Sequence, residues 1–192
     1  MKSRARSIAH AGVIAAVYAA LTLVVIQSPL GYGPVQFRLS EALTVLACLT
    51  PAAVPGLGIG TAVANAYLAT QFGVLAALDV VFGSLATLLG ALWAWRHRSR
   101  PALALAGPVV ANALIVPAYL PFLLAGLAGL DFYRIPALGV DAGGAWWSMY
   151  AFGLVTVGIG QAAVVYGLGL PLLRVLRRLG IARLLDGRDG GS

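Results

Sequence analysis

Long stretches without a charged side chain are the feature that most constrains this chain. Four of them exceed the roughly 20 apolar residues that a membrane-spanning helix needs, and a fifth is somewhat shorter. They cover residues 7–37, 42–78, 101–130, 142–173 and, for the shorter one, 80–95. Only 10% of the 192 residues are charged, against about 25% in soluble domains. The sequence therefore predicts an integral membrane protein.

The placement of the basic residues predicts which side of the membrane each end faces. The formal net charge of +7 could by itself suggest a nucleic-acid partner. Almost all basic residues, however, gather in three segments that flank the apolar stretches, at 2–6, 96–100 and 174–188. Such flanking clusters are the signature of cytoplasmic loops. We therefore expect both termini in the cytoplasm and no nucleic-acid partner.

The breaks between the apolar stretches predict six spans in a single transmembrane domain over residues 1–185. The predicted spans are 8–26, 35–49, 54–69, 75–95, 102–124 and 147–172. The region 35–70 is hard to divide, because it is too long for one span and contains Pro51 and Pro55. An even number of spans must separate the N-terminus from the 96–100 loop. Two short helices satisfy this, and so does a re-entrant hairpin that would leave four full spans.

We prefer the two short helices and thus an all-α bundle of six transmembrane helices. The second helix is short for a hydrocarbon core of about 30 Å, so we expect other helices to shield part of it. The last residues, 186–192, are polar and are expected to form a disordered tail.

Two acidic side chains, Glu41 and Asp79, fall inside predicted spans. An ionisable residue at such a place costs roughly 2.5–3.5 kcal/mol on insertion scales, so it suggests a function. Counting the helical rise from the outer helix ends places both carboxylates in the outer half of the membrane, with Asn65 at similar depth. Asn112 and Gln161 come out near the midplane. These residues predict a polar pocket that opens to the outside.

Each of these polar residues also has a purely structural interpretation. Glu41 can pair with Arg38, one helical turn earlier. Asp79 lies near a helix start, where it can interact with the helix dipole. Asn112 and Gln161 can form hydrogen bonds between helices.

The sequence holds no recognisable catalytic set. It has no P-loop and no His/Cys spacing typical of a metal site, so we expect neither an enzyme nor a bound metal or cofactor. Any uphill transport would need energy from a partner or from an ion gradient.

The first helix carries a stripe of small residues. Ala11, Ala15 and Ala19 recur every four residues, and a second row runs beside them at Gly12, Ala16 and Ala20. A smooth stripe of this kind lets another helix approach closely. The approaching helix belongs either to a partner protein or to the same chain.

Several blocks of the sequence resemble the QueT family. The strongest are VQFRLSEALTVL at 35–46, TPAAVPGL at 50–57 and LDVVFGSLATLL at 78–89, with weaker similarity at 112–116 and 167–172. This family comprises substrate-binding S-components of energy-coupling factor (ECF) transporters. The resemblance implies a six-helix subunit of the bacterial cytoplasmic membrane that binds a queuosine precursor. It also implies docking on a transmembrane T-component with two ABC ATPases, through Ala11, Ala15 and Ala19.

The ligand implied by the resemblance, a deazaguanine base, suggests roles for the polar residues. Adjacent N–H donors on a guanine-like edge suit a carboxylate, and an aminomethyl group adds a cation. Glu41 and Asp79 would divide these two roles. The other expected binding residues are Asn112, Asn65, Gln36, Arg38, Gln161 and Trp146, the last as an aromatic cover for the ring. Gln161 departs from the Glu that we expect in family members, which leaves the exact precursor open.

Two other functions fit the same residues. The chain can be an S-component for another heterocyclic or vitamin-like ligand. It can also be a stand-alone secondary transporter, in which Glu41 and Asp79 bind a coupling proton or ion.

Overall fold

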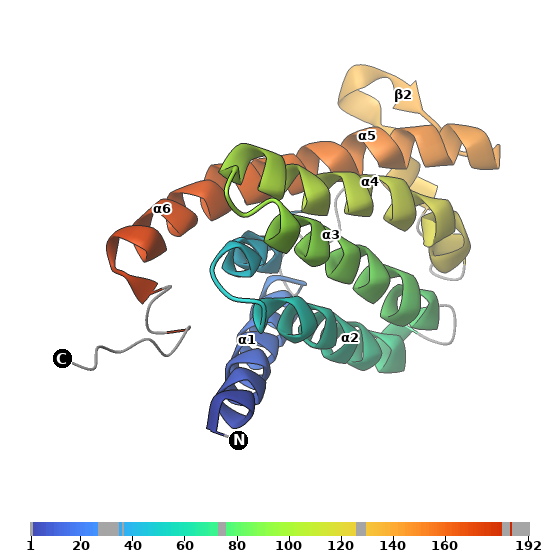
Figure 1. Ribbon diagram of the computed structural model, residues 1–192. Coiled ribbons are helices and arrows are strands. Elements are labelled where there is room, and N and C mark those ends of the chain that lie inside the picture. Colours follow the sequence, from blue (N-terminus) through green and yellow to red (C-terminus); the bar gives the residue numbers. More distant parts are fainter. Residues whose placement is uncertain are drawn as a thin grey trace.

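The computed structural model describes residues 2–26, 35, 37–72, 76–125, 130–181 and 185. Helices dominate these residues (Figure 1). The longer segments are α1 Lys2–Ile26, η2 Leu39–Cys48, α2 Ala53–Phe72, η4 Asp79–Gly83, α3 Ser84–Arg96, α4 Pro101–Ala125, α5 Trp146–Val164, η7 Val165–Gly169 and α6 Leu170–Arg178. Helices thus occupy each of the six segments for which the sequence predicted a span. The expected tail, 186–192, lies outside the described residues.

Among the described residues, three helical stretches are long and apolar enough to cross a bilayer. They are Arg4–Val25, Pro101–Leu124 and Trp146–Arg178, the last combining α5, η7 and α6. η2 is a shorter apolar helix. These helices agree with the predicted all-α membrane protein, while the count of six spans and the orientation of the termini stay predictions.

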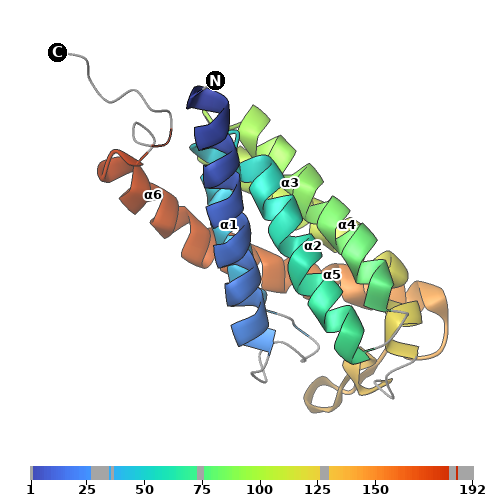
Figure 2. The ribbon, with the colours of Figure 1, turned by 90° about the horizontal axis from the view of Figure 1, so that it is seen from below.

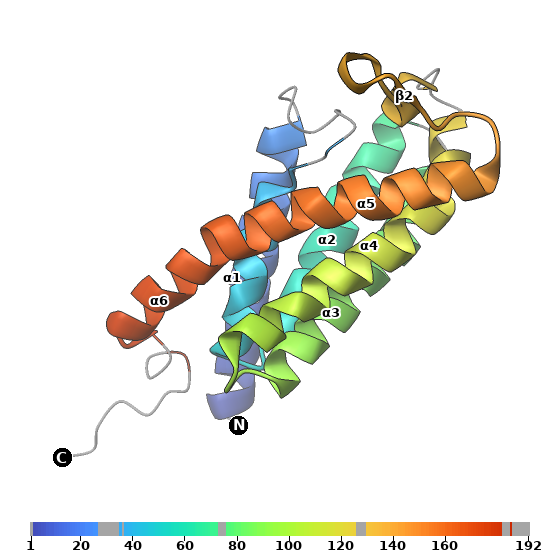
Figure 3. The ribbon, with the colours of Figure 1, turned by 90° about the horizontal axis from the view of Figure 1, so that it is seen from above.

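The basic segments lie at one end of the bundle. Figures 2 and 3 show the start of α1, the turn between α3 and α4, and the end of α6 at the same end. Arg177 of α6 donates a hydrogen bond of 2.9 Å to the carbonyl oxygen of Arg98 in that turn. The positive-inside rule predicts that this end of the bundle, where the basic segments gather, faces the cytoplasm.

η2 lies at the centre of the bundle and contacts α1, α2, α3, α4, α5, η7 and α6. It is a 3-10 helix of 10 residues, and at about 2.0 Å per residue it covers about 20 Å. Residues three apart eclipse each other in such a helix, and the row Glu41, Thr44 and Ala47 has no exposed surface. The expectation that other helices shield this short element is therefore confirmed.

The stripe Ala11, Ala15 and Ala19 packs against another helix of the same chain. Ala15 and Ala19 are only 8% and 7% exposed. A Cβ atom added to Gly56 would lie 2.8 Å from the Ala11 carbonyl oxygen, and one added to Gly60 would lie 2.7 Å from that of Ala15. The glycines thus let α2 approach α1 closely. Within the subunit α2 therefore contacts this face of α1, and the docking role of the stripe stays a prediction.

A small β-hairpin in the loop before α5 departs from the all-α prediction. After the 3-10 turn η5 Leu130–Tyr133, strand β1 Arg134–Ile135 pairs antiparallel with β2 Val140–Asp141, with the turn η6 Pro136–Leu138 between them. Tyr133 packs against Phe152 of α5, and burial raises the pKa of its hydroxyl. The hairpin lies at the end of the bundle opposite the basic segments (Figures 2 and 3).

Candidate functional site

Glu41 lies at the meeting point of four helices and is completely buried. Its Oε1 accepts hydrogen bonds from the Tyr18 hydroxyl of α1 and from the Thr87 hydroxyl of α3, the latter at 3.2 Å. Its Oε2 accepts a hydrogen bond of 2.8 Å from Nε2 of Gln161 in α5. The eclipsed geometry of η2 points this side chain into the interior. The carboxylate therefore joins α1, η2, α3 and α5.

The partners of Glu41 are all electrically neutral. An ionised carboxylate offers about four lone-pair sites, and the three donors occupy three of them. Neither ion pair among the described residues involves Glu41. A buried charge without a counter-ion is costly, so an additional donor or a positive charge beside Glu41 would stabilise its ionised form.

Asp79 lies in a second polar cluster that does contain a cation. Its Oδ2 lies 3.3 Å from Nη2 of Arg38, and its Oδ1 accepts a hydrogen bond from the Tyr119 hydroxyl of α4. Asn65 of α2 donates a hydrogen bond of 2.7 Å to the Asp79 backbone carbonyl. The Arg38 and Asp79 side chains are 25% and 13% exposed. This cluster is thus less enclosed than the one around Glu41.

These contacts correct the predicted pairing of Glu41 with Arg38. Arg38 pairs with Asp79 instead of Glu41, because it precedes η2 with a non-helical backbone (φ −81°, ψ 88°) and does not stack in the helical row. Asp79 is the acidic residue in the first turn of the π-helix η4, so its interaction with the helix dipole stays a prediction. Its carboxylate faces Arg38 and Tyr119.

The two clusters lie at different depths along one helix. Asp79 begins η4, which continues directly into α3, and Thr87 lies eight residues further on. At about 1.5 Å per residue this separates the clusters by about 12 Å along the helix axis. Because α3 ends in the basic turn, the Asp79 cluster is nearer to the hairpin end and the Glu41 cluster is deeper.

Gly83 makes room for the Asp79 carboxylate. A Cβ atom added there would overlap Oδ1 of Asp79 and would lie 3.0 Å from Nδ2 of Asn65. The π-helical turn brings residues 79 and 83 into this close relation, and π-bulges are frequent at functional sites. The geometry of the Asp79 cluster therefore depends on the absence of a side chain at position 83.

Two of the predicted site residues that the structure describes are not brought to the carboxylates. Asn112 donates a hydrogen bond of 2.9 Å to the Pro108 carbonyl within its own helix. Trp146 stacks on Tyr150 and donates to the Ala118 carbonyl at 3.3 Å, at the start of α5. Gln36 lies outside the described residues. Of the predicted set, the structure thus joins Gln161 to Glu41, and Arg38 and Asn65 to Asp79.

The sequence prediction missed Tyr18 and Thr87 as partners of Glu41. Hydroxyl side chains are common in apolar helices, and only the three-dimensional packing reveals which of them faces a buried acid. Tyr119, which donates to Asp79, also stacks on Phe82 with ring centroids 5.7 Å apart.

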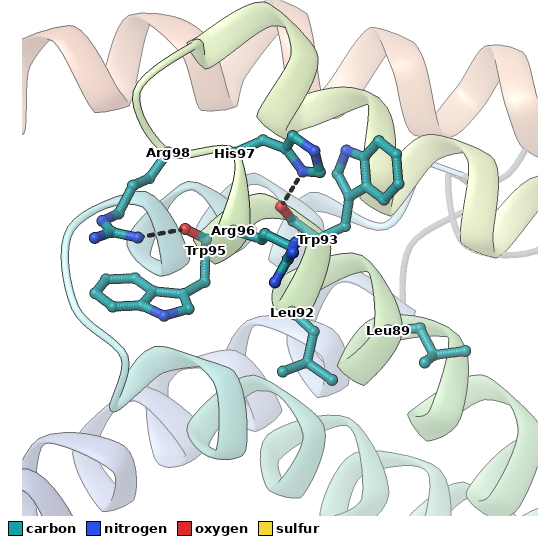
Figure 4. Close-up of a pocket in the computed structure, with 7 residues that line it drawn as sticks. All are labelled: Leu89, Leu92, Trp93, Trp95, Arg96, His97 and Arg98. Atoms are coloured by element: carbon teal, nitrogen blue, oxygen red, sulfur yellow. Dashed lines mark hydrogen bonds between the residues drawn. The ribbon is translucent and has the colours of Figure 1, made fainter.

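A surface hollow lies at the basic end of the bundle, and neither carboxylate lines it. Figure 4 shows the residues that form it. It has a volume of about 810 Å³. Its walls come from the end of α3 and the turn that follows, namely Leu89, Leu92, Trp93, Trp95, Arg96, His97 and Arg98.

Comparison with known proteins places the chain in a family. The queuosine precursor transporter QueT of Lactococcus lactis subsp. cremoris (strain MG1363) is 33% identical over 88 residues. The aligned part covers 46% of this chain and about half, 48%, of that relative. No solved structure matches the chain. The family model described as QueT transporter matches residues 8–178, so the chain belongs to the QueT transporter family.

Proposed function

We propose that this protein is the substrate-binding S-component of an ECF importer and captures a deazaguanine queuosine precursor from outside. Membership of the QueT transporter family supports transport of such a precursor. The observation that carries the proposal is Glu41, an enclosed carboxylate that has three neutral donors and no ion-pair partner among the described residues. The protein would act by binding alone and would reside in the bacterial cytoplasmic membrane as a multi-pass subunit.

Glu41 suits the donor edge of a deazaguanine. Such an edge presents adjacent N–H groups, and a carboxylate is the acceptor that receives them most strongly. The ligand would take the remaining lone-pair site of Glu41 or replace one of its neutral donors, Tyr18 or Thr87. Gln161 would hold the carboxylate in place from α5. The Gln161 amide would thus orient the carboxylate that accepts hydrogen bonds from the N–H groups of the ligand.

The charges around the two clusters favour a cationic precursor. Among the described residues, Arg38 is the cation that contacts them, against the two acids Glu41 and Asp79. If both acids are ionised, one negative charge stays uncompensated. A precursor with a protonated aminomethyl group would neutralise it, whereas a neutral base would not. We therefore propose that an aminomethyl deazaguanine binds more tightly than a deazaguanine without the amine.

Calorimetry on the purified protein tests the binding site. The protein should bind the aminomethyl deazaguanine without any ion gradient. Glu41→Gln should weaken binding by about 10-fold to 100-fold, because a hydrogen bond to a charged group contributes about 1.5–3 kcal/mol. Asp141→Asn is the matched control, since it removes an exposed carboxylate in the hairpin and should leave affinity unchanged. Binding that is undetectable for every deazaguanine, or unaltered by Glu41→Gln, would refute the ligand assignment.

The energy source is proposed to be a T-component with two ABC ATPases. The rival function, a stand-alone secondary transporter, uses the same acids to bind a proton or ion. The two differ in liposomes that hold only this protein. We expect no uptake there, and accumulation of the precursor driven by an imposed ion gradient would establish the rival function.

A further inference from the structure

The hollow at the end of α3 has an apolar half and a basic half (Figure 4). Leu89, Leu92 and Trp93 form the apolar half and are 44%, 46% and 44% exposed. Arg96, His97 and Arg98 follow directly at the end of the helix and form the basic half. Along α3 the surface therefore changes from hydrocarbon-like to cationic within about two helical turns.

Contacts on several sides hold the basic half in place. The Arg98 guanidinium lies 4.0 Å from the centre of the Trp95 ring and donates to the Trp95 carbonyl at 3.0 Å. The His97 ring lies over Trp93, with centroids 4.1 Å apart. The Trp93 indole in turn donates a hydrogen bond of 2.9 Å to the Leu103 carbonyl. The Arg98 guanidinium is thus held over the Trp95 ring, and the His97 ring is held beside Trp93.

The cations of the hollow have no acidic partner among the described residues. The two ion pairs of the described residues, Arg38–Asp79 and Arg134–Asp141, lie outside the hollow. An arginine guanidinium stays charged and offers five N–H donors that match phosphate oxygens. The described residues around the hollow therefore supply no anion to neutralise these arginines.

We infer that this hollow binds an anionic phospholipid. The headgroup phosphate would contact Arg96 and Arg98, and an acyl chain would lie along Leu89 and Leu92. The apolar half selects a lipid over a soluble phosphate, since a soluble anion gains nothing from exposed leucines. The cationic half selects an anionic lipid over a zwitterionic one. Tryptophan beside arginine is also the composition found at a membrane interface.

Native mass spectrometry of the full chain in detergent measures this selectivity. The protein is titrated with dioleoyl phosphatidylglycerol and, separately, with dioleoyl phosphatidylcholine. We expect tighter binding of phosphatidylglycerol. The double variant Arg96→Gln/Arg98→Gln should reduce the preference by roughly tenfold or more, because each basic residue near an anionic surface contributes about fivefold. Leu89→Ala/Leu92→Ala should weaken binding of phosphatidylglycerol through lost contact with the acyl chain.

The double variant Arg4→Gln/Arg6→Gln is the matched control. It removes two exposed cations at the same end of the bundle, so it changes the net charge equally but should preserve the preference. Equal binding of the two lipids would overturn the inference, as would a preference that survives Arg96→Gln/Arg98→Gln. Competition by glycerol 3-phosphate as effective as that by phosphatidylglycerol would instead establish a site for soluble anions and refute the lipid.

Discussion

Glu41 and Asp79 are both buried acids, yet their neighbours leave them unequally able to accept a hydrogen bond from a ligand. Asp79 already has a counter-ion in Arg38 and a neutral donor in Tyr119. In the described part of the chain, the side-chain donors to the Glu41 carboxylate are all neutral. Breaking an ion pair to admit a ligand costs the energy of that pair, whereas adding a donor to Glu41 does not. This difference supports the proposal that the ligand binds at Glu41 and that the Arg38–Asp79 pair shapes the part of the site nearer the hairpin.

Replacing Gly83 with alanine tests whether the Asp79 cluster has room for one more carbon atom. The new Cβ would lie only 2.3 Å from Asp79 Oδ1 and should displace the carboxylate from Arg38 and Tyr119. We expect a loss of about 1–3 kcal/mol, since hydrogen bonds to a charged group are broken. A lower thermal unfolding midpoint in detergent would report it.

Gly158→Ala is the control for this substitution. The nearest atom to its added Cβ is that of Ala113, at an ordinary 3.5 Å. Alanine is favoured over glycine inside a helix by roughly 0.5–1 kcal/mol, so this variant should be as stable as the parent or slightly more stable. If Gly83→Ala behaves in the same way, Gly83 does not limit the position of Asp79.

The candidate site could be predicted from the sequence only in part, for a physical reason. Charged residues in an apolar span stand out because of their insertion cost, so Glu41 and Asp79 were found directly. Their partners depend on which helices meet. Arg38 is three residues from Glu41 and 41 residues from Asp79, yet it pairs with the distant acid because the chain bends just before η2. No local pattern encodes that choice.

At the scale of the helix, the segments were predictable but their internal geometry was not. Proline, glycine and charge mark where apolar stretches end, and these marks placed all six segments correctly. Whether a buried segment forms an α-, 3-10 or π-helix depends on its packing. η2 is surrounded on all sides, so its neighbours can hold a long 3-10 run that is uncommon in isolation.

The contact between α1 and α2 links packing to the site. Gly60 approaches both Ala15 and Tyr18, and a Cβ atom added there would lie 2.9 Å from the Tyr18 Cβ. Tyr18 is also a donor to Glu41. Gly60→Ala should therefore force the helices apart at a cost of about 1–3 kcal/mol, typical of overpacking, and should move a donor away from Glu41.

Thermal unfolding and ligand binding together measure this effect. Gly12→Ala, on the other helix of the pair, serves as the control, because an added Cβ there meets no atom within 4 Å. It should match or exceed the parent in stability. A Gly60→Ala protein with unchanged unfolding midpoint and affinity would show that the helices can separate without disturbing Glu41.

At the scale of the whole molecule, the packing of α1 changes where a partner could dock. Its inner face, with Ala15 and Ala19, is occupied by α2. The neighbouring row Gly12, Ala16 and Ala20 is exposed. We therefore propose this second row as the contact with the T-component, since it keeps the small residues that close helix approach requires and lies on the free side of the helix.

Ala16→Leu separates docking from binding. A leucine on this exposed face meets no packed neighbour within the subunit, so the purified variant should bind the deazaguanine with the affinity of the parent. In cells that also produce the T-component and both ATPases, it should hold the partner helix away and reduce uptake at least tenfold. Ala151→Leu on the exposed face of α5 makes the same change in size and should leave uptake intact.

Equal uptake by the two variants would move the docking surface off α1, whereas loss of ligand binding in Ala16→Leu would mean that this face supports the fold. Only the pattern of intact binding with lost uptake assigns the row to a partner, because it requires a step that the isolated subunit does not perform.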